Sequence, residues 1–282
     1  MGAEVIGMAD AACPGHAPVL EETAIVVTND RLAPNLGVAW LRSPQVAAAA
    51  RPGQFVHVGF PGLEAHLLRR PLGVMDVSDD KTQLAVLYQA VGFATQRLYD
   101  LCAGAPLSVM GPIGKEWPLP SFAADSADGR RVLVVAGGVG ASPLLLHTRR
   151  LAEAGWGVDV VLGAQTASQL VCRAAYEAIP GVCVTCTTDD GTFGEAGFAT
   201  SPALRAIEAG HVGMVCTCGP EPLMRAVAEA AFAKGIPAFA SLERRMACGI
   251  GACLSCVVDT ASGKRRVCVD GPVFDAAGVV WS

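Results

Sequence analysis

The stretch Arg131–Leu146 reads RVLVVAGGVGASPLLL and holds the pattern that decides the fold. Its first half is an apolar, β-branched run of the kind found in strands that are buried on both faces. A glycine-rich turn follows over Gly137–Pro143, and apolar residues continue as an expected helix to about Ala154. Pro143 suits the first turn of a helix, where a backbone N–H has no partner inside the helix. The stretch therefore predicts a strand–turn–helix unit of a parallel sheet.

The same alternation continues toward the C-terminus. Further strands are expected at Val158–Leu162, Val182–Thr187 and Val212–Thr217, and further helices at Gln169–Ala178, Pro202–Ala209 and Pro222–Lys234. Strands that alternate with helices are typical of a parallel sheet covered by helices on both faces. Residues 131–240 are therefore expected to form a Rossmann-like nucleotide domain.

The pattern differs toward the N-terminus. Short strands are expected at Ala24–Thr28, Trp40–Arg42, Gln54–Gly59, Leu84–Ala90 and Leu107–Met110, separated by Gly and Pro. Such strands favour a small antiparallel β-barrel over residues 19–120. The run Arg69–Gly73 falls between them and is interpreted as a turn at a strand end. Residues 1–18 read as a flexible tail, and residues 116–130 read as a linker.

Composition narrows the function classes. Of the 282 residues, 52% are hydrophobic and 17% charged, which excludes a disordered chain, and the net charge of −5 argues against nucleic-acid binding. The longest apolar stretch, Val132–Leu146, is too short and too broken to span a membrane. The N-terminus does not look like a secretory signal. Eleven cysteines without such a signal suggest a reducing compartment, and we expect a cytoplasmic protein.

Four cysteines near the C-terminus carry the most specific motif. Cys248, Cys253, Cys256 and Cys268 have the spacing C-x4-C-x2-C-x11-C, whose first part is that of plant-type [2Fe–2S] proteins. Small residues between them allow a loop to wrap closely around a cluster and to point N–H groups at the sulfurs. Zinc binding and buried core cysteines are the alternatives. Residues 241–282 are expected to form a small cluster domain of short irregular segments.

The remaining cysteine pairs do not predict a second metal site. Cys183 and Cys186 fall on one expected strand, where their side chains would point to opposite faces. Both this pair and the pair Cys216 and Cys218 are interpreted as small core residues. The five histidines have no ligand spacing and are interpreted as surface residues or as buried residues with hydrogen-bond partners.

Two turns predict a nucleotide site. Gly138, Gly140 and Pro143 lie in a G-x-G-x-x-P turn, which differs from the G-x-G-x-x-G dinucleotide motif. The second turn, Cys218-Gly219-Pro220, also joins a strand to a helix. Both turns would face one crevice at the carboxyl ends of the strands, where helix N-termini attract a diphosphate. Each could also be a plain structural turn. No Arg or Lys lies in Gly163–Thr166 to meet a 2′-phosphate, which favours NAD over NADP.

With these motifs in place, roughly residues 20–282 resemble the electron-transfer subunits of class-B dihydroorotate dehydrogenase, in the ferredoxin–NADP reductase-like superfamily. The run SLERRMACGIGACLSCVV at residues 241–258 carries most of the resemblance. The resemblance implies a flavin barrel, a nucleotide domain and a cluster domain in that order. It implies that FAD is held by Arg70, Pro71, Leu72, Gly73, Leu87, Tyr88, Gln89, Ala94 and Thr95. The family usually has Ser at the position of Gly73, Arg at that of Gln89 and Gly at that of Ala94, and each change removes or crowds a flavin contact.

The resemblance also implies a function. A separate FMN-containing catalytic subunit oxidises dihydroorotate, and this chain would pass the electrons through [2Fe–2S] and FAD to NAD⁺, in a heterotetramer with two copies of each subunit. The chain would then carry cofactor-binding residues but no catalytic residue for dihydroorotate. One alternative is the corresponding subunit of another complex, such as an NADH-dependent ferredoxin:NADP oxidoreductase or a sulfide dehydrogenase. The other is a redox-sensing or structural zinc module that has lost its flavin.

Overall fold

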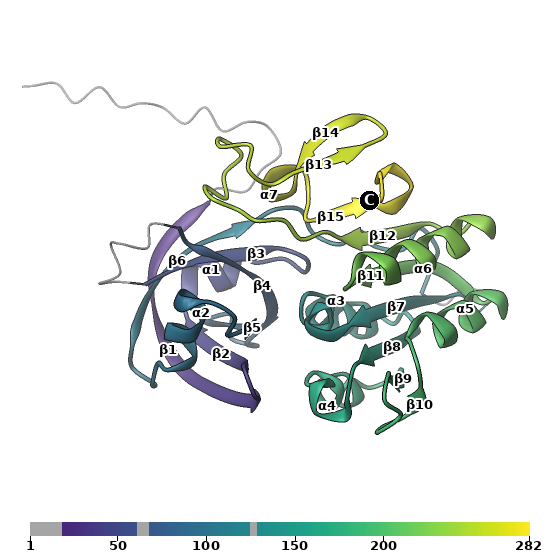
Figure 1. Ribbon diagram of the computed structural model, residues 1–282, viewed down its shortest axis with the longest axis horizontal. Helices are drawn as coiled ribbons and strands as arrows, with labels where there is room; N and C mark the ends of the chain where they lie inside the picture. The colour runs from purple at the N-terminus through teal and green to yellow at the C-terminus, as the bar shows by residue number, and fades with distance from the viewer. Residues whose placement is uncertain (1–18, 61–67, 125–128) are drawn as a thin grey trace, which may run out of the picture.

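The computed structural model describes residues 19–60, 68–124 and 129–282. A β-barrel and an α/β unit lie side by side, and the C-terminal elements lie above both (Figure 1). The predicted fold class, an antiparallel barrel followed by a Rossmann-like unit and a small cluster region, is confirmed. The tail expected over residues 1–18 lies outside the described residues.

The barrel is closed and antiparallel, with the strand order β1-β2-β5-β4-β3-β6. The strands are β1 (Leu20–Ala33), β2 (Leu36–Arg42), β3 (Phe55–Gly59), β4 (Arg70–Val77), β5 (Gln83–Gln89) and β6 (Pro106–Ile113), and the helices are α1 (Pro44–Ala49) and α2 (Phe93–Tyr99). Alternate residues of β3 and β4, such as Val56 and Leu72, fill the barrel core. The turn expected at Arg69–Gly73 was wrong, because β4 begins there and pairs with β3.

The α/β unit is a seven-stranded sheet with the order β10-β9-β8-β7-β11-β12-β15. Its strands are β7 (Arg131–Gly137), β8 (Val158–Ala164), β9 (Val182–Thr188), β10 (Glu195–Ala196), β11 (Val212–Cys218), β12 (Ala238–Ser241) and β15 (Val273–Asp275). The strands β7 to β12 run parallel, whereas β15 pairs antiparallel with β12. A strand from the C-terminal segment thus closes one edge of this sheet.

Helices cover both faces of the sheet, as predicted. The helical segments are η1 (Gly138–Ala141), α3 (Ser142–Glu153), η2 (Ala167–Gln169), α4 (Arg173–Glu177), α5 (Thr200–Glu208) and α6 (Glu221–Ala233). The face of the sheet that α3 and α4 cover shares a hydrophobic core with Val38 and Leu87 of the barrel. The helix α3 therefore lies between the sheet and the barrel (Figure 1). The helix expected over Gln169–Ala178 is shorter, because residues 170–172 form a turn between η2 and α4.

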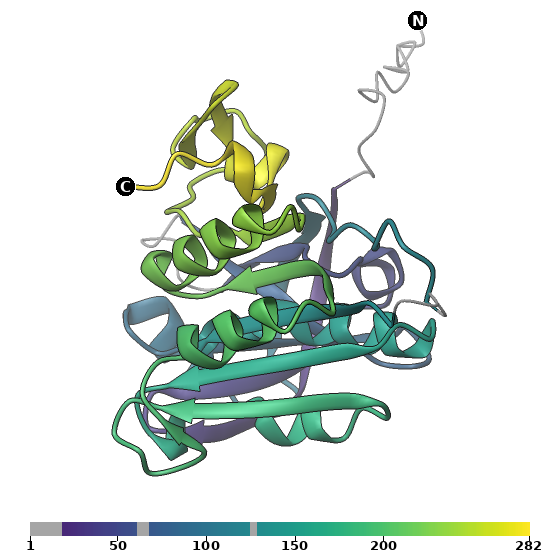
Figure 2. The same ribbon diagram turned by 90° about the vertical axis from the view of Figure 1, so that its right-hand side faces the viewer.

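The C-terminal segment is more regular than expected. It forms the hairpin β13 (Val257–Thr260) and β14 (Gly263–Arg266), the short α7 (Val267–Asp270), β15 and η3 (Ala276–Gly278). These elements stack above α6 and β12 (Figure 2). Cys256 and Cys268 lie in one apolar cluster with Phe55 of the barrel and Ala228 of α6, so this segment packs on both other units.

The segment 116–130 lacks strands and helices over its described residues, but it is anchored at its start. Trp117 is only 3% exposed, and its indole Nε1 donates to the Pro143 carbonyl at 3.1 Å. The indole also stacks on the His147 ring at 5.8 Å between centroids. Trp117 thereby fixes the start of α3. Within the described residues, every helix is too short or too polar to cross a bilayer.

Candidate functional site

The two glycine turns expected to bind a nucleotide lie in direct backbone contact. They follow β7 and β11, which are neighbours in the sheet, so both turns lie at the carboxyl ends of parallel strands. A Cβ on Gly140 would lie 2.5 Å from the Cys218 carbonyl oxygen and 2.8 Å from the Gly219 nitrogen. Gly138 has a φ of +56°, and a Cβ there would meet nothing within 4 Å. Gly140 therefore joins the turns, while Gly138 faces open space.

The barrel strand β4 brings its expected flavin residues to the same place. Leu72 points into the barrel core, so its neighbours Pro71 and Gly73 face outward. A Cβ on Gly73 would lie 3.4 Å from the Cβ of Pro143, at the start of α3. Arg70 lies at the beginning of β4 and donates to the Leu68 carbonyl at 2.7 Å. The expected flavin and nucleotide residues therefore meet between β4 and α3.

The second group of expected flavin residues is mostly buried. Tyr88 is 2% exposed, its hydroxyl donates to Asn29 Oδ1 at 2.6 Å, and burial raises its pKa to about 12. Its phenol is thus a barrel-core group rather than a surface that a cofactor can stack on. Leu87 packs toward the α/β unit, whereas Gln89 is exposed.

The start of α2 is a tightly bonded turn. Ala94 and Thr95 are buried, and Thr95 Oγ1 accepts from the Gly92 nitrogen at 3.2 Å and donates to the Gly92 carbonyl at 3.0 Å. The Thr95 side chain is therefore used in shaping this turn. The backbone around Gly92 is open to a ligand here, as are the exposed side chains of Gln89, Val91 and Phe93.

The four expected cluster cysteines lie as two pairs. The Sγ atoms of Cys256 and Cys268, both buried, are 3.3 Å apart, while Cys248 Sγ accepts from the backbone nitrogen of Cys253 at 3.4 Å. Across residues 19–60, 68–124 and 129–282, no three or more His, Cys, Asp or Glu side chains form a ready metal site. The pairs are nevertheless close enough for Cys248 to contribute to raising the pKa of Cys268.

The chemistry of this loop fits a thiolate-bound metal cluster. Burial raises the pKa of the Cys248 thiol, but hydrogen bonds from backbone N–H groups and from the Cys253 side chain outweigh that effect and lower the pKa to about 7. These N–H groups belong to Cys253, Ile250 and Ala252. A further one, from Gly251, points to Cys268. Amides directed at sulfur are what a cluster held by thiolates requires.

His57 is a site residue that the sequence reasoning missed. It lies on the outer face of β3, is 0% exposed, and neither ring nitrogen has a hydrogen-bond partner among the described residues. A Cβ on Gly249 would lie 2.8 Å from its Cε1 atom and 2.9 Å from its Nδ1 atom. Burial, and then the charge of Arg69, lower its pKa to about 4, so the imidazole is neutral at pH 7.

The interpretation of His57 as a surface residue, or one with hydrogen-bond partners, was therefore wrong. Every residue of Phe55–Val58 is buried, so both faces of β3 are covered. The uninterrupted FVHV run is the sequence signal that could have shown this burial, because a strand with one solvent-exposed face alternates apolar and polar residues.

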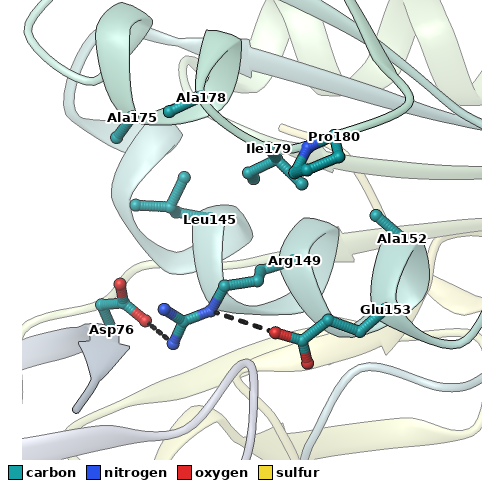
Figure 3. A pocket seen from close by; sticks show the side chains of 9 residues that line it. All are labelled: Asp76, Leu145, Arg149, Ala152, Glu153, Ala175, Ala178, Ile179 and Pro180. Carbon is teal, nitrogen blue, oxygen red and sulfur yellow. Dashed lines mark hydrogen bonds and ion pairs between the residues drawn. The ribbon is translucent and has the colours of Figure 1, made fainter. Parts of the chain in front are cut away.

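A cavity of about 370 Å³ lies away from these residues (Figure 3). It is lined by α3, by the segment Ala175–Pro180 and by Asp76 of β4. Arg149 forms an ion pair with Asp76 and lies 3.9 Å from Glu153. Neither the glycine turns nor the cysteine loop contributes to it. Its residues join barrel and α/β unit rather than form part of the site.

Comparison with known proteins assigns the family. Residues 243–280, which include all four cysteines, match the iron-sulfur cluster binding domain of dihydroorotate dehydrogenase B. The electron transfer subunit of dihydroorotate dehydrogenase B (NAD(+)) from Desulforamulus reducens is 35% identical over 89% of this chain and 94% of its own length. That from Geobacillus kaustophilus is 37% identical over 82% and 87%. The chain belongs to this family of electron transfer subunits.

Solved structures agree with that assignment. A chain of an NADH-dependent reduced ferredoxin-NADP oxidoreductase has a TM-score of 0.81 and 28% identity, covering 95% of this subunit and 91% of that chain. A ferredoxin NADP+ reductase from Neisseria gonorrhoeae, with a TM-score of 0.59 and 16% identity over 78% and 93%, shares the fold. The resemblance drawn from the sequence is confirmed. This chain is an electron transfer subunit of an oxidoreductase, and the chain itself carries an iron-sulfur binding domain.

Proposed function

We propose that this subunit relays electrons from an FMN-containing dihydroorotate dehydrogenase catalytic subunit to NAD⁺, with a [2Fe–2S] cluster and FAD between them. One observation carries the proposal: the outer face of β3 and β4 contacts both other units. His57 of β3 lies against Gly249 of the cysteine loop, and Gly73 of β4 lies against Pro143 of the nucleotide turn. A bound flavin supplies the chemistry that joins the two ends, because it exchanges electrons singly with a cluster and in pairs with NAD.

The barrel residues would position FAD. Pro71 and Gly73 present backbone on the outward face of β4, and Arg70 places a guanidinium at the end of that strand, suited to a pyrophosphate. The buried Tyr88, Ala94 and Thr95 would support the binding backbone from behind rather than touch the cofactor with their side chains. Gln89 offers an exposed amide.

The glycine turns would hold NAD. Gly138 leaves open space at the start of the η1–α3 segment, and Pro220 precedes α6, so two helix starts face the same place. Free N–H groups and the positive ends of the helix dipoles favour a diphosphate there. Without a basic residue in Gly163–Thr166, a 2′-phosphate has no cation to meet, which supports NAD over NADP.

The cysteine loop would hold the cluster and present it to the partner. The C-x4-C-x2-C spacing supports [2Fe–2S] over zinc. Ile250 and Leu254, between the cysteines, are 55% and 62% exposed, as expected of an apolar contact with another protein. We propose that the catalytic subunit docks here, in an assembly with two copies of each subunit. The ten cysteines of the described residues form no disulfide, in keeping with the cytoplasmic location that we propose.

The test is anaerobic purification with absorption and EPR spectra, followed by a titration with NADH. We expect FAD, about two irons per chain, and bleaching of both the flavin and the cluster absorption by NADH. Addition of the catalytic subunit and dihydroorotate should then reduce NAD⁺ only when both proteins are present. A colourless chain that holds zinc would overturn the proposal and favour the zinc module.

A second candidate follows from the structural comparison. The chain of an NADH-dependent reduced ferredoxin-NADP oxidoreductase matches nearly the whole subunit. If this subunit served such a complex, its cluster and flavin would bleach with NADH, but dihydroorotate with the catalytic subunit would leave NAD⁺ unreduced. Reduced ferredoxin would be the donor to try in that case.

A further inference from the structure

A buried imidazole lies between the barrel and the cysteine loop without a hydrogen-bond partner. Nδ1 and Nε2 of His57 are both unpartnered within the described residues, although the side chain is 0% exposed. Leaving such a group buried and unpaired is destabilising. An apolar residue would fill the same space without that cost, so packing alone does not explain the choice of histidine.

The surroundings of the ring show what it faces. Inside the barrel, Val56 and Val58 flank it on the opposite face of β3, so the ring points out of the barrel. On the outside it meets Gly249, the residue after Cys248, whose φ of +71° bends the loop over the imidazole. On β4, the residue opposite His57 is Pro71, from the expected flavin set. The ring therefore lies beside the expected flavin residues of β4 and against the cysteine loop.

We propose that His57 is a positioning residue whose N–H donates a hydrogen bond to the sulfur of the cluster held by the loop 248–256, and so raises its reduction potential. The inference rests on the proposed function. It adds a side-chain donor, supplied by the barrel, to the backbone donors of the loop itself.

The direction of the effect follows from charge. Reduction by one electron adds negative charge to the sulfurs, and a hydrogen-bond donor stabilises that charge. A neutral imidazole always carries one N–H, so the donor is present at pH 7 without protonation of the ring. Gly249 is required for the approach, because a side chain at that position would collide with the ring.

The test is an EPR-monitored redox titration of the cluster in the full chain with its cofactors. His57→Leu removes the donor at similar volume, and His57→Gln keeps an N–H. We expect His57→Leu to shift the ratio of reduced to oxidised cluster about tenfold toward oxidised at a fixed potential, which is 59 mV for one electron. We expect His57→Gln to recover most of that shift.

His147 supplies the matched control. It is also buried, at 1% exposure, with an unpartnered Nε2 in the described part of the chain, but it stacks on Trp117 rather than on the cysteine loop. His147→Leu should leave the cluster potential unchanged. If His57→Leu leaves the potential unchanged, or if the Leu and Gln variants lower it equally, the donor role is overturned. A wild-type chain that binds no iron would overturn both this inference and the proposed function.

Discussion

At the scale of single residues, Gly138 and Gly140 lie in the same turn but serve different purposes. Gly140 has no room for a side chain because the backbone of Cys218 and Gly219 occupies that space. Gly138 has room, but its φ of +56° is strained for other residues, and its open side faces the expected diphosphate. One glycine is needed for packing and the other for ligand access.

The corresponding alanine variants should therefore separate stability from binding. Gly140→Ala should cost about 1–3 kcal/mol of unfolding free energy, as overpacking does in cores. Gly138→Ala should cost about 1 kcal/mol of unfolding free energy from backbone strain. It should nevertheless weaken NADH binding more than Gly140→Ala does. Thermal unfolding and NADH titration of both variants check this. The interpretation fails if Gly140→Ala unfolds like the wild type, or if Gly138→Ala binds NADH normally.

Single residues also mark the limit of what could be predicted from the sequence. The contact between the two glycine turns was predictable, because both turns follow neighbouring parallel strands. The orientation of Tyr88 was not, since its partner Asn29 is on β1, 59 residues away. For His57, the FVHV run could have shown that the ring is buried, but not that Gly249 covers it, because that residue is distant in sequence.

At the scale of elements, six strands were missed, namely β4, β10, β12, β13, β14 and β15. β4 begins with Arg-Pro, which favours a turn, and a register irregularity between Val74 and Asp76 breaks its alternation. β15 has only three residues and takes its place from pairing with β12. The long apolar strands β7, β8 and β11 were predictable, because strands buried on both faces have nearly continuous runs of apolar, β-branched residues.

An ion pair between Asp76 and Arg149 links β4 to α3. Burial raises the pKa of the Asp76 carboxyl, and the Arg149 guanidinium offsets only part of that effect. Because this pKa is raised in the folded state, the contribution of Asp76 to stability is present at low pH and is lost as pH rises through the folded pKa. Arg149 limits that loss, and it also donates to the Val77 carbonyl at 2.9 Å.

Arg149→Met should therefore destabilise the fold in a pH-dependent way. We expect a loss of about 2 kcal/mol at pH 8, below the range for fully buried pairs because both side chains retain some exposure. The loss should shrink toward pH 5, as the unpaired carboxyl takes up a proton. Urea unfolding at several pH values measures it. Arg205→Met, which breaks a pair whose side chains are 60% and 48% exposed, is the control and should cost less than about 1 kcal/mol.

At the scale of the whole molecule, four segments of the sequence converge on one face of the barrel. Residues 55–57, 70–73, 137–143 and 248–251 meet there, although up to about two hundred residues separate them. The order of the domains could be predicted from the sequence, but this convergence could not, because it depends on how α3 and the cysteine loop pack on the barrel. The cysteine loop contacts that face through Gly249, while the glycine turns contact it through Pro143.

Because the two contacts are separate, electron transfer through the cluster should be separable from electron transfer between NADH and the flavin. Cys253 is exposed, whereas Cys256 and Cys268 are buried, so its side chain is not part of the packing of the loop on the rest of the chain. Cys253→Ser should therefore remove the cluster EPR signal and electron transfer to the catalytic subunit. NADH-dependent reduction of ferricyanide, which needs only the flavin and nucleotide sites, should stay within about twofold of the wild type, a difference of less than 1 kcal/mol.

Cys183→Ser is the matched control. The interpretation of Cys183 as a core residue was wrong, because it is an exposed thiol on β9 outside the loop. It should leave both activities and the EPR signal intact. If Cys253→Ser instead loses FAD or ferricyanide reduction together with its cluster, the loop and the barrel do not act independently. The cluster would then be part of what holds the barrel face in place, and the contact between Gly249 and His57 would be the element through which its loss reaches the flavin.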